Sequence, residues 1–290
     1  MRHRKAPSPV EEGSDGDGRT KAKGRSAESR PTGGRAGLRI LVWNINMAAH
    51  KKIALLRHLQ PDLAILPECA APDVIVAKCP DFTFTDAQWQ ERSRHKGLGV
   101  FSFGNLRLTR SPDYDPRFAV FLPLEVKGGQ RFNLLAVWAL NFRVGSGGTM
   151  PDALHFYRRF LASTEAVVAG DFNNSVFWDR PGKPTNFAGI AAVLSEFGLA
   201  SAYHTVTGES FAQERQPTLW FLKRPHQGYH IDYCFMPRAW FSRPVSVWVG
   251  QPGQWLAHSD HAPLVVADLG QSPDSRQTRE PTVAAAPGYA

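Results

Sequence analysis

Apolar runs the length of a β-strand recur along this chain of 290 residues, from Leu38 to Asp268. No linker separates the runs, so they predict one domain. Several runs are apolar at successive positions, as in the segment LLAVWAL at 134–140, and would be buried on both faces. Strands of this kind are covered on both sides, so we expect one β-sheet to pack on another, with helices outside.

The expected elements comprise many strands and few helices. Strands are predicted at 38–46, 63–66, 98–103, 118–124, 132–140, 166–169, 218–222, 231–236, 245–249 and 264–267. Helices are predicted at 47–59, 152–163 and 186–197, the last with Asn186 as its N-cap. The first of these helices carries apolar residues among basic ones, which is typical of an amphipathic helix.

Both ends of the chain have the composition of disordered segments. Met1–Ala36 is rich in Gly, Ser, Pro, Arg and Lys, and Gly270–Ala290 is rich in Ser, Pro, Thr and Ala. Neither segment has enough apolar surface to offset the entropy lost on ordering, so we expect a folded domain at 37–269 between two disordered tails. The formal net charge is +8, and the first tail is basic. A basic balance favours polyanionic partners such as nucleic acid or anionic lipid, although it also serves solubility alone.

The sequence predicts neither a membrane span nor a secretory signal. No apolar run approaches the roughly 20 residues that cross a bilayer, and the charged residues at 2–5 have no apolar stretch behind them. The three cysteines, Cys69, Cys79 and Cys234, are odd in number and fit no zinc-binding spacing. We therefore expect reduced, buried thiols and a cytoplasmic location.

Polar side chains stand where the predicted strands end. They are Asn44 and Asn46, Glu68, Asp171 and Asn173, Asp232, and Asp260 with His261. A charged group beside a buried strand costs several kcal/mol unless it is paired or bound to a metal, and loops at strand ends often carry catalytic groups. Each residue alone has an ordinary explanation, such as a turn or a cap, but together they favour one functional site. Oxygen ligands without a Cys/His cluster indicate magnesium or manganese rather than zinc.

Five ordered motifs resemble those of the endonuclease/exonuclease/phosphatase superfamily. They are Trp43-Asn44, Leu66-Pro67-Glu68, Gly170-Asp171-Phe172-Asn173, Ile231-Asp232 and Ser259-Asp260-His261. The superfamily includes DNase I, exonuclease III-type AP endonucleases, neutral sphingomyelinases and inositol phosphatases, and the resemblance covers almost all of 37–269. It implies an α+β fold, a four-layer DNase I-like sandwich in which two packed, mainly antiparallel β-sheets are flanked by helices.

The resemblance implies a metal site and a substrate site. Glu68 resembles the metal-binding glutamate, with Asn44 and Asp260 near the same ion. The ion is expected to be Mg²⁺, with Mn²⁺ as a substitute. Asn141 and Trp220, in the segments Trp-Ala-Leu-Asn and Thr-Leu-Trp, are expected to contact substrate.

The resemblance also implies the acid–base residues. Asp171 resembles the residue that orients or deprotonates the attacking water, and Asn173 resembles the donor to a phosphate oxygen. Asp232 and His261 resemble an Asp–His pair in which the acid fixes the imidazole tautomer. An imidazolium and an amide in these places would stabilise the charge of a pentavalent transition state.

Three positions depart from the AP endonuclease pattern. Asn46 stands where those enzymes usually have Asp, and Pro67 stands where they usually have Gln. Trp138 stands where they have Tyr and other relatives have His, and an indole cannot act as an acid. These changes weaken any expectation of abasic-site specificity but leave the hydrolase expectation in place.

Three functions are compatible with these residues. The first is a metal-dependent endonuclease or exonuclease acting on nucleic acid as a monomer, with phosphate contacts from basic residues near 92–96 and 223–224. The second is a phosphatase or phosphodiesterase for a lipid, an inositol phosphate or another small phosphate ester, which would use the same catalytic set. The third, an inactive binding module, is disfavoured because every core motif is present. No protein partner can be inferred from the sequence.

Overall fold

The apolar runs form two β-sheets of six strands each in a computed structural model that describes residues 37–118, 121–140 and 149–268. The predicted tails, Met1–Ala36 and Gly270–Ala290, lie outside the described residues, as does Asn141. No helix among the described residues has the length and apolar character needed to cross a bilayer.

The first sheet contains one parallel pair of strands, β1 and β2, and is otherwise antiparallel. In spatial order, its strands are β13 (Val245–Val249), β14 (Leu264–Asp268), β1 (Arg39–Val42), β2 (Leu63–Cys69), β4 (Lys96–Ser102) and β3 (Asp86–Ser93). The helices that precede or follow these strands in the chain are α1 (Ile53–Leu59), α2 (Pro72–Lys78) and α7 (Pro252–Trp255), with the 3₁₀ turns η1 (Ala49–Lys51) and η5 (Arg238–Ser242).

The second sheet also contains one parallel pair, β7 and β8. In spatial order, its strands are β5 (Arg107–Arg110), β6 (Phe121–Lys127), β7 (Phe132–Trp138), β8 (Ala166–Asp171), β12 (Asp232–Pro237) and β9 (Leu199–Ser201). A two-stranded ribbon is made by β10 (Leu219–Trp220) and β11 (Gly228–Tyr229). The remaining elements are α3 (Met150–Phe156), α4 (Arg158–Ala162), α5 (Phe187–Glu196), α6 (Ala202–Thr207), η2 (Pro116–Phe118), η3 (Val176–Trp178) and η4 (Phe221–Lys223).

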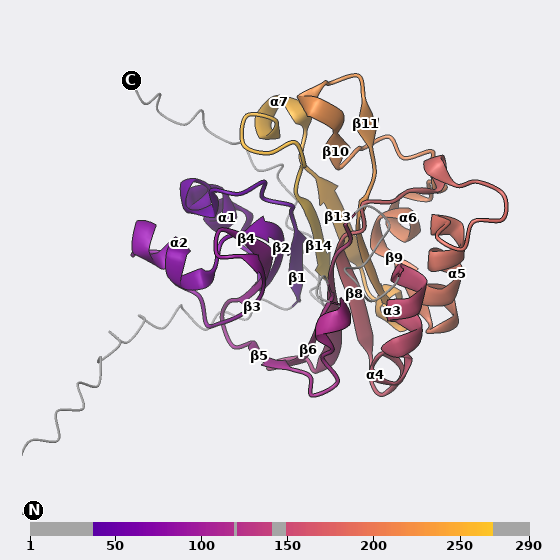
Figure 1. The fold of residues 1–290 in the computed structure, drawn as a ribbon, viewed down its shortest axis with the longest axis horizontal. Coiled ribbons are helices and arrows are strands. Elements are labelled where there is room, and N and C mark those ends of the chain that lie inside the picture. Colours follow the sequence, from indigo (N-terminus) through magenta and orange to yellow (C-terminus); the bar gives the residue numbers. More distant parts are fainter. Residues whose placement is uncertain (1–36, 119–120, 141–148, 269–290) are drawn as a thin grey trace, which may run out of the picture. The chain divides into compact units, whose positions relative to one another are not determined.

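Strand β7 shows why both faces of a central strand are apolar. Leu134 and Ala136 belong to the cluster between the sheets, whereas Leu135 and Val137 belong to a second cluster that includes α3, α4 and α5. Figure 1 shows these helices on one side of the strands and α1 and α2 on the other. The prediction of an α+β sandwich of two mainly antiparallel sheets flanked by helices is confirmed.

The predicted helices differ from the observed ones at their starts and centres. The helix predicted at 47–59 begins only at Ile53, because the residues at 46–48 have left-handed φ values of 45°, 59° and 47°. The helix predicted at 152–163 is divided at Tyr157 into α3 and α4. Asn186 is the N-cap of α5 by position only. The Asp179 carboxylate accepts the first amide hydrogen bonds of that helix instead.

Strand β3 was not predicted, since its sequence DAQWQERS is polar. It lies at the edge of its sheet, where only β4 pairs with it. Its side chains are half-buried or exposed, so burial imposes no apolar pattern on the sequence there.

Gly170 permits the close pairing of β7 and β8 at the start of the Gly-Asp-Phe-Asn segment. Its φ is +146°, and a Cβ atom there would lie 1.9 Å from the Val137 carbonyl oxygen. Only glycine tolerates both conditions without movement of one strand. The end of β8, which carries Asp171, therefore depends on this residue.

We predict that Gly170→Ala lowers the free energy of unfolding by about 3 kcal/mol or more, because backbone atoms must move apart. Gly189→Ala in α5 is the matched control, since nothing lies within 4 Å of its added Cβ. That control should gain about 0.5–1 kcal/mol from helix propensity. Urea denaturation measures both changes, and equal stability of Gly170→Ala and the unaltered chain would contradict the prediction.

Candidate active site

One edge of the first sheet collects the residues predicted to bind metal. Because β1 and β2 are parallel, their carboxyl ends lie at the same edge, and the antiparallel β14 begins there. Asn44 follows β1, Glu68 lies near the end of β2, and Asp260 precedes β14. The strand order β14–β1–β2 therefore brings the three side chains to one edge from distant parts of the chain.

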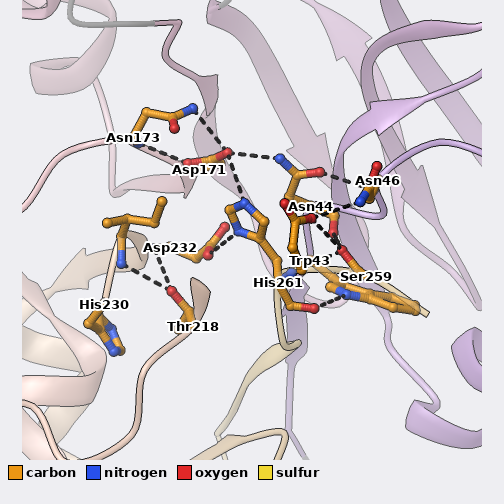
Figure 2. A network of polar contacts seen from close by, with 12 residues as sticks. Trp43, Asn44, Asn46, Asp171, Asn173, Thr218, His230, Asp232, Ser259 and His261 are labelled. Carbon is orange, nitrogen blue, oxygen red and sulfur yellow. Dashed lines mark hydrogen bonds and ion pairs between the residues drawn. The ribbon is translucent and has the colours of Figure 1, made fainter. Parts of the chain in front are cut away.

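The matching edge of the second sheet carries the residues predicted to take part in proton transfer. Strand β8 ends at Asp171, and the antiparallel β12 begins at Asp232, its direct partner in the register. A hydrogen bond of 2.9 Å from Asn44 Nδ2 to Asp171 Oδ2 joins this edge to the first sheet. Figure 2 shows the resulting network, in which the imidazole of His261 lies between the two carboxylates.

Asp171 is fully buried and held by amide groups. Its Oδ2 accepts from Asn44 and from Asn173 Nδ2 at 3.2 Å, and its Oδ1 accepts from the Asn173 backbone N–H at 2.8 Å. Burial and the neighbouring Asp232 raise the pKa of Asp171 to about 7. A carboxylate with such a pKa is suited to take a proton near neutral pH.

His261 is paired with Asp232 through its other ring nitrogen. The Nδ1 atom lies 2.8 Å from Asp232 Oδ2, and Nε2 lies 4.0 Å from Asp171 Oδ2. Burial disfavours the imidazolium, but Asp232 and Asp171 outweigh this effect and raise the pKa of His261 to about 10. The ring is therefore a cation at neutral pH, with Nε2–H directed toward Asp171.

Thr218 connects the two partners of this pair. Its buried hydroxyl accepts hydrogen bonds from the backbone N–H groups of Ile231 and Asp232, each at 3.0 Å. Its carbonyl accepts from the N–H of Ala262 at 2.7 Å. One residue thus fixes the start of β12 and the segment after His261. The sequence marked Thr218 only as part of the Thr-Leu-Trp segment. A hydroxyl side chain at the start of a predicted strand is the signal that would have revealed this role.

Ser259 and Trp43 hold His261 from the side of the first sheet. The Ser259 hydroxyl donates to the Asn44 carbonyl at 2.8 Å and accepts from the His261 backbone N–H at 3.0 Å. The indole N–H of Trp43 donates to the His261 carbonyl at 3.0 Å. These bonds connect the residue after β1 to the residue before β14, so the imidazole is fixed relative to both sheets (Figure 2).

Glu68 reaches the site through an irregularity in β2. It has a left-handed φ of 60°, and the register of β2 with β4 shifts between Pro67 and Cys69. A bulge of this kind redirects one side chain while the strand continues. The Glu68 carboxylate forms an ion pair of 2.7 Å with Lys96, a partner that the sequence did not predict.

Asn46 links the residues predicted to bind metal. Its Nδ2 donates to Asp260 Oδ1 at 2.8 Å, and its backbone N–H donates to Asn44 Oδ1 at 3.0 Å. The next residue, Met47, donates its N–H to the Glu68 carbonyl at 3.0 Å. The turn after β1 therefore contacts Asn44, Glu68 and Asp260.

Two groups of side chains offer ligand atoms to a metal ion. Asn44, Glu68 and Asp260 supply amide and carboxylate oxygens, which suit a hard cation such as Mg²⁺. The ligand atoms of Asp171, Asp232 and His261 lie within 4.8 Å of one another and form a second group. The second group is buried and is joined by the His261–Asp232 hydrogen bond and the Asp171–His261 ion pair. Asn44, Glu68 and Asp260 stay the residues predicted to bind Mg²⁺.

The remaining predicted residues lie beside this network. Asn173 has a left-handed φ of 47°, and its Nδ2 also donates to the Ala139 carbonyl at 2.6 Å. Trp220 is buried, and its backbone N–H donates to the Asp260 carbonyl at 2.8 Å. The substrate contact expected of Trp220 stays a prediction. Trp138 is also buried, with Lys96 Nζ 5.6 Å from the centre of its ring.

No family model and no curated protein matches the chain, but solved structures resemble it. The AP endonuclease LMAP from Leishmania major has 13% identity and a TM-score of 0.60, over 80% of this chain and 88% of that one. An AP endonuclease from Archaeoglobus fulgidus has 15% identity and a TM-score of 0.58, over 79% and 98%. The 3′–5′ exonuclease NExo from Neisseria meningitidis has 17% identity and a TM-score of 0.56, over 79% and 98%.

At identities of 13–17%, these matches show a shared arrangement of strands and helices, that is, the fold alone. The matches extend over about four-fifths of the chain. The chain therefore has the DNase I-like fold of the endonuclease/exonuclease/phosphatase proteins.

Proposed function

We propose that this chain is a divalent-metal-dependent phosphodiesterase that acts on nucleic acid as an endonuclease or exonuclease. The observation that carries the proposal is the network of hydrogen bonds and an ion pair that joins Asn44, Asp171, Asp232 and His261. Glu68 and Asp260, the predicted metal ligands, lie at the adjoining edge of the first sheet. The catalytic domain would span 37–269, and the segments before and after it would be tails.

The residues have complementary roles in the proposed reaction. Asp171, with its pKa near 7, takes a proton from the attacking water. The His261 imidazolium and the Asn173 amide stabilise negative charge on the phosphoryl oxygens, and Asp232 holds the ring in place. Bound by Asn44, Glu68 and Asp260, a Mg²⁺ ion would supply charge neutralisation and stabilisation of the leaving oxygen.

Basic side chains beside the network support a nucleic acid substrate. Lys96 pairs with Glu68 and lies over Trp138, and the guanidinium of Arg92 lies 6.0 Å from the centre of the same ring. The backbone of a nucleic acid strand offers successive phosphates to cations placed in this way. Two of the structural neighbours are AP endonucleases and a third is an exonuclease, which agrees with this choice.

A lipid phosphodiester is the second candidate substrate, and one surface feature favours it. Phe221 and Leu222, in the turn between β10 and β11, are 51% and 64% exposed. Lys223 and Arg224 follow them and are exposed as well. Apolar side chains beside cations suit the interface of an anionic membrane. The catalytic network would serve either substrate.

A cleavage assay with a panel of substrates tests metal dependence and substrate class together. With Mg²⁺, the chain should cleave plasmid, single-stranded DNA, abasic duplex or RNA faster than sphingomyelin vesicles or inositol phosphates, and EDTA should abolish the activity. Glu68→Ala should raise the Mg²⁺ concentration needed for half-maximal rate, because a charged ligand is lost. Glu125→Ala is the control, since Glu125 forms a similar 2.7 Å pair with Lys127. Full activity in EDTA excludes the metal role, and faster cleavage of lipid favours the second candidate.

The raised pKa of Asp171 should lower the free energy of unfolding as pH rises. Its pKa is raised from 3.8 to about 7 in the folded state. Between these values the folded chain holds a proton that the unfolded chain releases, so the free energy of unfolding falls as pH increases through this range. Above pH 7 the folded chain carries a buried carboxylate opposite Asp232, and this cost is fully present.

We therefore predict that Asp171→Asn loses activity and gains stability. It should lower kcat by about 10²-fold or more, because the base is lost while size and polarity are kept. In EDTA at pH 8 it should raise the free energy of unfolding by about 1 kcal/mol or more, and the gain should shrink toward pH 4. Single-turnover kinetics and urea denaturation at the two pH values measure these effects. An unchanged kcat would remove Asp171 from the mechanism.

A double-mutant cycle tests the pair of Asp232 and His261. Asp232→Asn and His261→Ala should each lower kcat, because one removes the orienting acid and the other removes the cation. If Asp232 acts through His261, the double variant should be little worse than His261→Ala alone, since residues that act as a unit are not additive. Losses in kcat that multiply fully would show that the two residues act separately.

A further inference from the structure

Lys52 is a buried lysine whose ammonium contacts only backbone oxygens in the described structure. Lys52 is 6% exposed and lies between η1 and α1. The Nζ atom donates to the carbonyls of Ile45, Asn46 and Met47, at 3.3 Å and 3.0 Å for the last two. An ammonium has three donors, so three successive carbonyls can satisfy this one completely.

The turn that Lys52 contacts is unfavourable by itself. Asn46, Met47 and Ala48 are left-handed in succession, although none of them is glycine. Each such residue costs roughly 1–2 kcal/mol. The turn also brings the negative ends of three carbonyl dipoles to one point, where only a cation or several donors can compensate for them. Burial and Lys223 lower the pKa of Lys52 to about 8, so the ammonium is charged at neutral pH.

The same turn orients the side of the site assigned to the metal. Asn46 donates to Asp260 Oδ1 and to Asn44 Oδ1, and Met47 donates to the Glu68 carbonyl. A turn that relaxed to right-handed φ values would move the Asn46 amide away from Asp260. Lys52 thus contacts the carbonyls of Asn46 and Met47, and these two residues in turn bond to Asn44, Glu68 and Asp260.

We propose that Lys52 is an internal cation that holds the 45–47 carbonyls together and so positions Asn44, Glu68 and Asp260 for a divalent metal. Lys52 is a positioning residue, because its ammonium is turned onto the backbone and its side chain is buried. The inference rests on the proposed metal dependence of the site. It adds a residue that lies outside all five motifs of the sequence.

Titration of Mn²⁺ into the full chain without substrate, followed by electron paramagnetic resonance, tests the proposal. Lys52→Met should raise the dissociation constant of Mn²⁺ about tenfold or more, the usual effect of removing an outer partner of metal ligands. Lys51→Met is the matched control, since it removes the same charge from an exposed neighbouring side chain. It should bind Mn²⁺ as the unaltered chain does.

Chemical rescue separates the charge from the packing of the side chain. Lys52→Ala lacks the atoms of propylammonium, so added propylammonium should restore much of its Mn²⁺ affinity, and propanol, which has a similar shape and no charge, should not. Hydrogen exchange at the Met47 amide, which donates to Glu68, should be faster in Lys52→Ala and should slow again with propylammonium.

Each result decides for or against the proposal. Mn²⁺ affinity within twofold of the unaltered chain in folded Lys52→Met, or equal rescue by propanol, would overturn it while leaving the proposed function in place. An unaltered chain that binds no Mn²⁺ would overturn both. If Lys52→Met, Lys52→Ala and Lys52→Gln all fail to fold even with propylammonium, Lys52 serves the fold rather than the metal side, and the proposal is wrong.

Discussion

The hydrogen bond from the Asn44 amide to the Asp171 carboxylate joins the two sheets at the site, and the geometry of the site depends on it. Asn44 also accepts hydrogen bonds from Asn46 and from Ser259, so two further bonds on the side of the first sheet fix its position. Asp171 is fixed by the end of β8 and by the Asn173 turn. Because both partners are buried, their bond is shielded from water, and neither side chain has room to turn away.

The charges of the site offset one another only in part. Asp171 and Asp232 face each other across neighbouring strands, which is unfavourable for two carboxylates. The imidazolium of His261 lies between them and offsets that repulsion, and the same carboxylates raise its pKa. One oxygen, Asp232 Oδ1, is buried without a hydrogen-bond partner among the described residues. Such a partly satisfied network costs stability.

The sequence predicted the layers and the ends of the strands because burial leaves a direct signal there. The apolar run at 134–140 required cover on both faces, and β7 has it. Edge strand β3 left no such signal, since its polar sequence faces little of the core. The bulge at Glu68 was equally hidden, because a left-handed φ at a glutamate is set by its neighbours in the sheet and not by its own preference.

Contacts made by long side chains were the least predictable part of the site. Lys96 lies 28 positions from Glu68 in the sequence, and only the pairing of β2 with β4 brings the two together. Lys52 is close in sequence to the carbonyls it contacts, yet a lysine in the basic segment before α1 suggests a solvated face rather than a buried cation. The residues proposed to perform chemistry therefore had a sequence signature, whereas the contacts that position them follow from the tertiary fold.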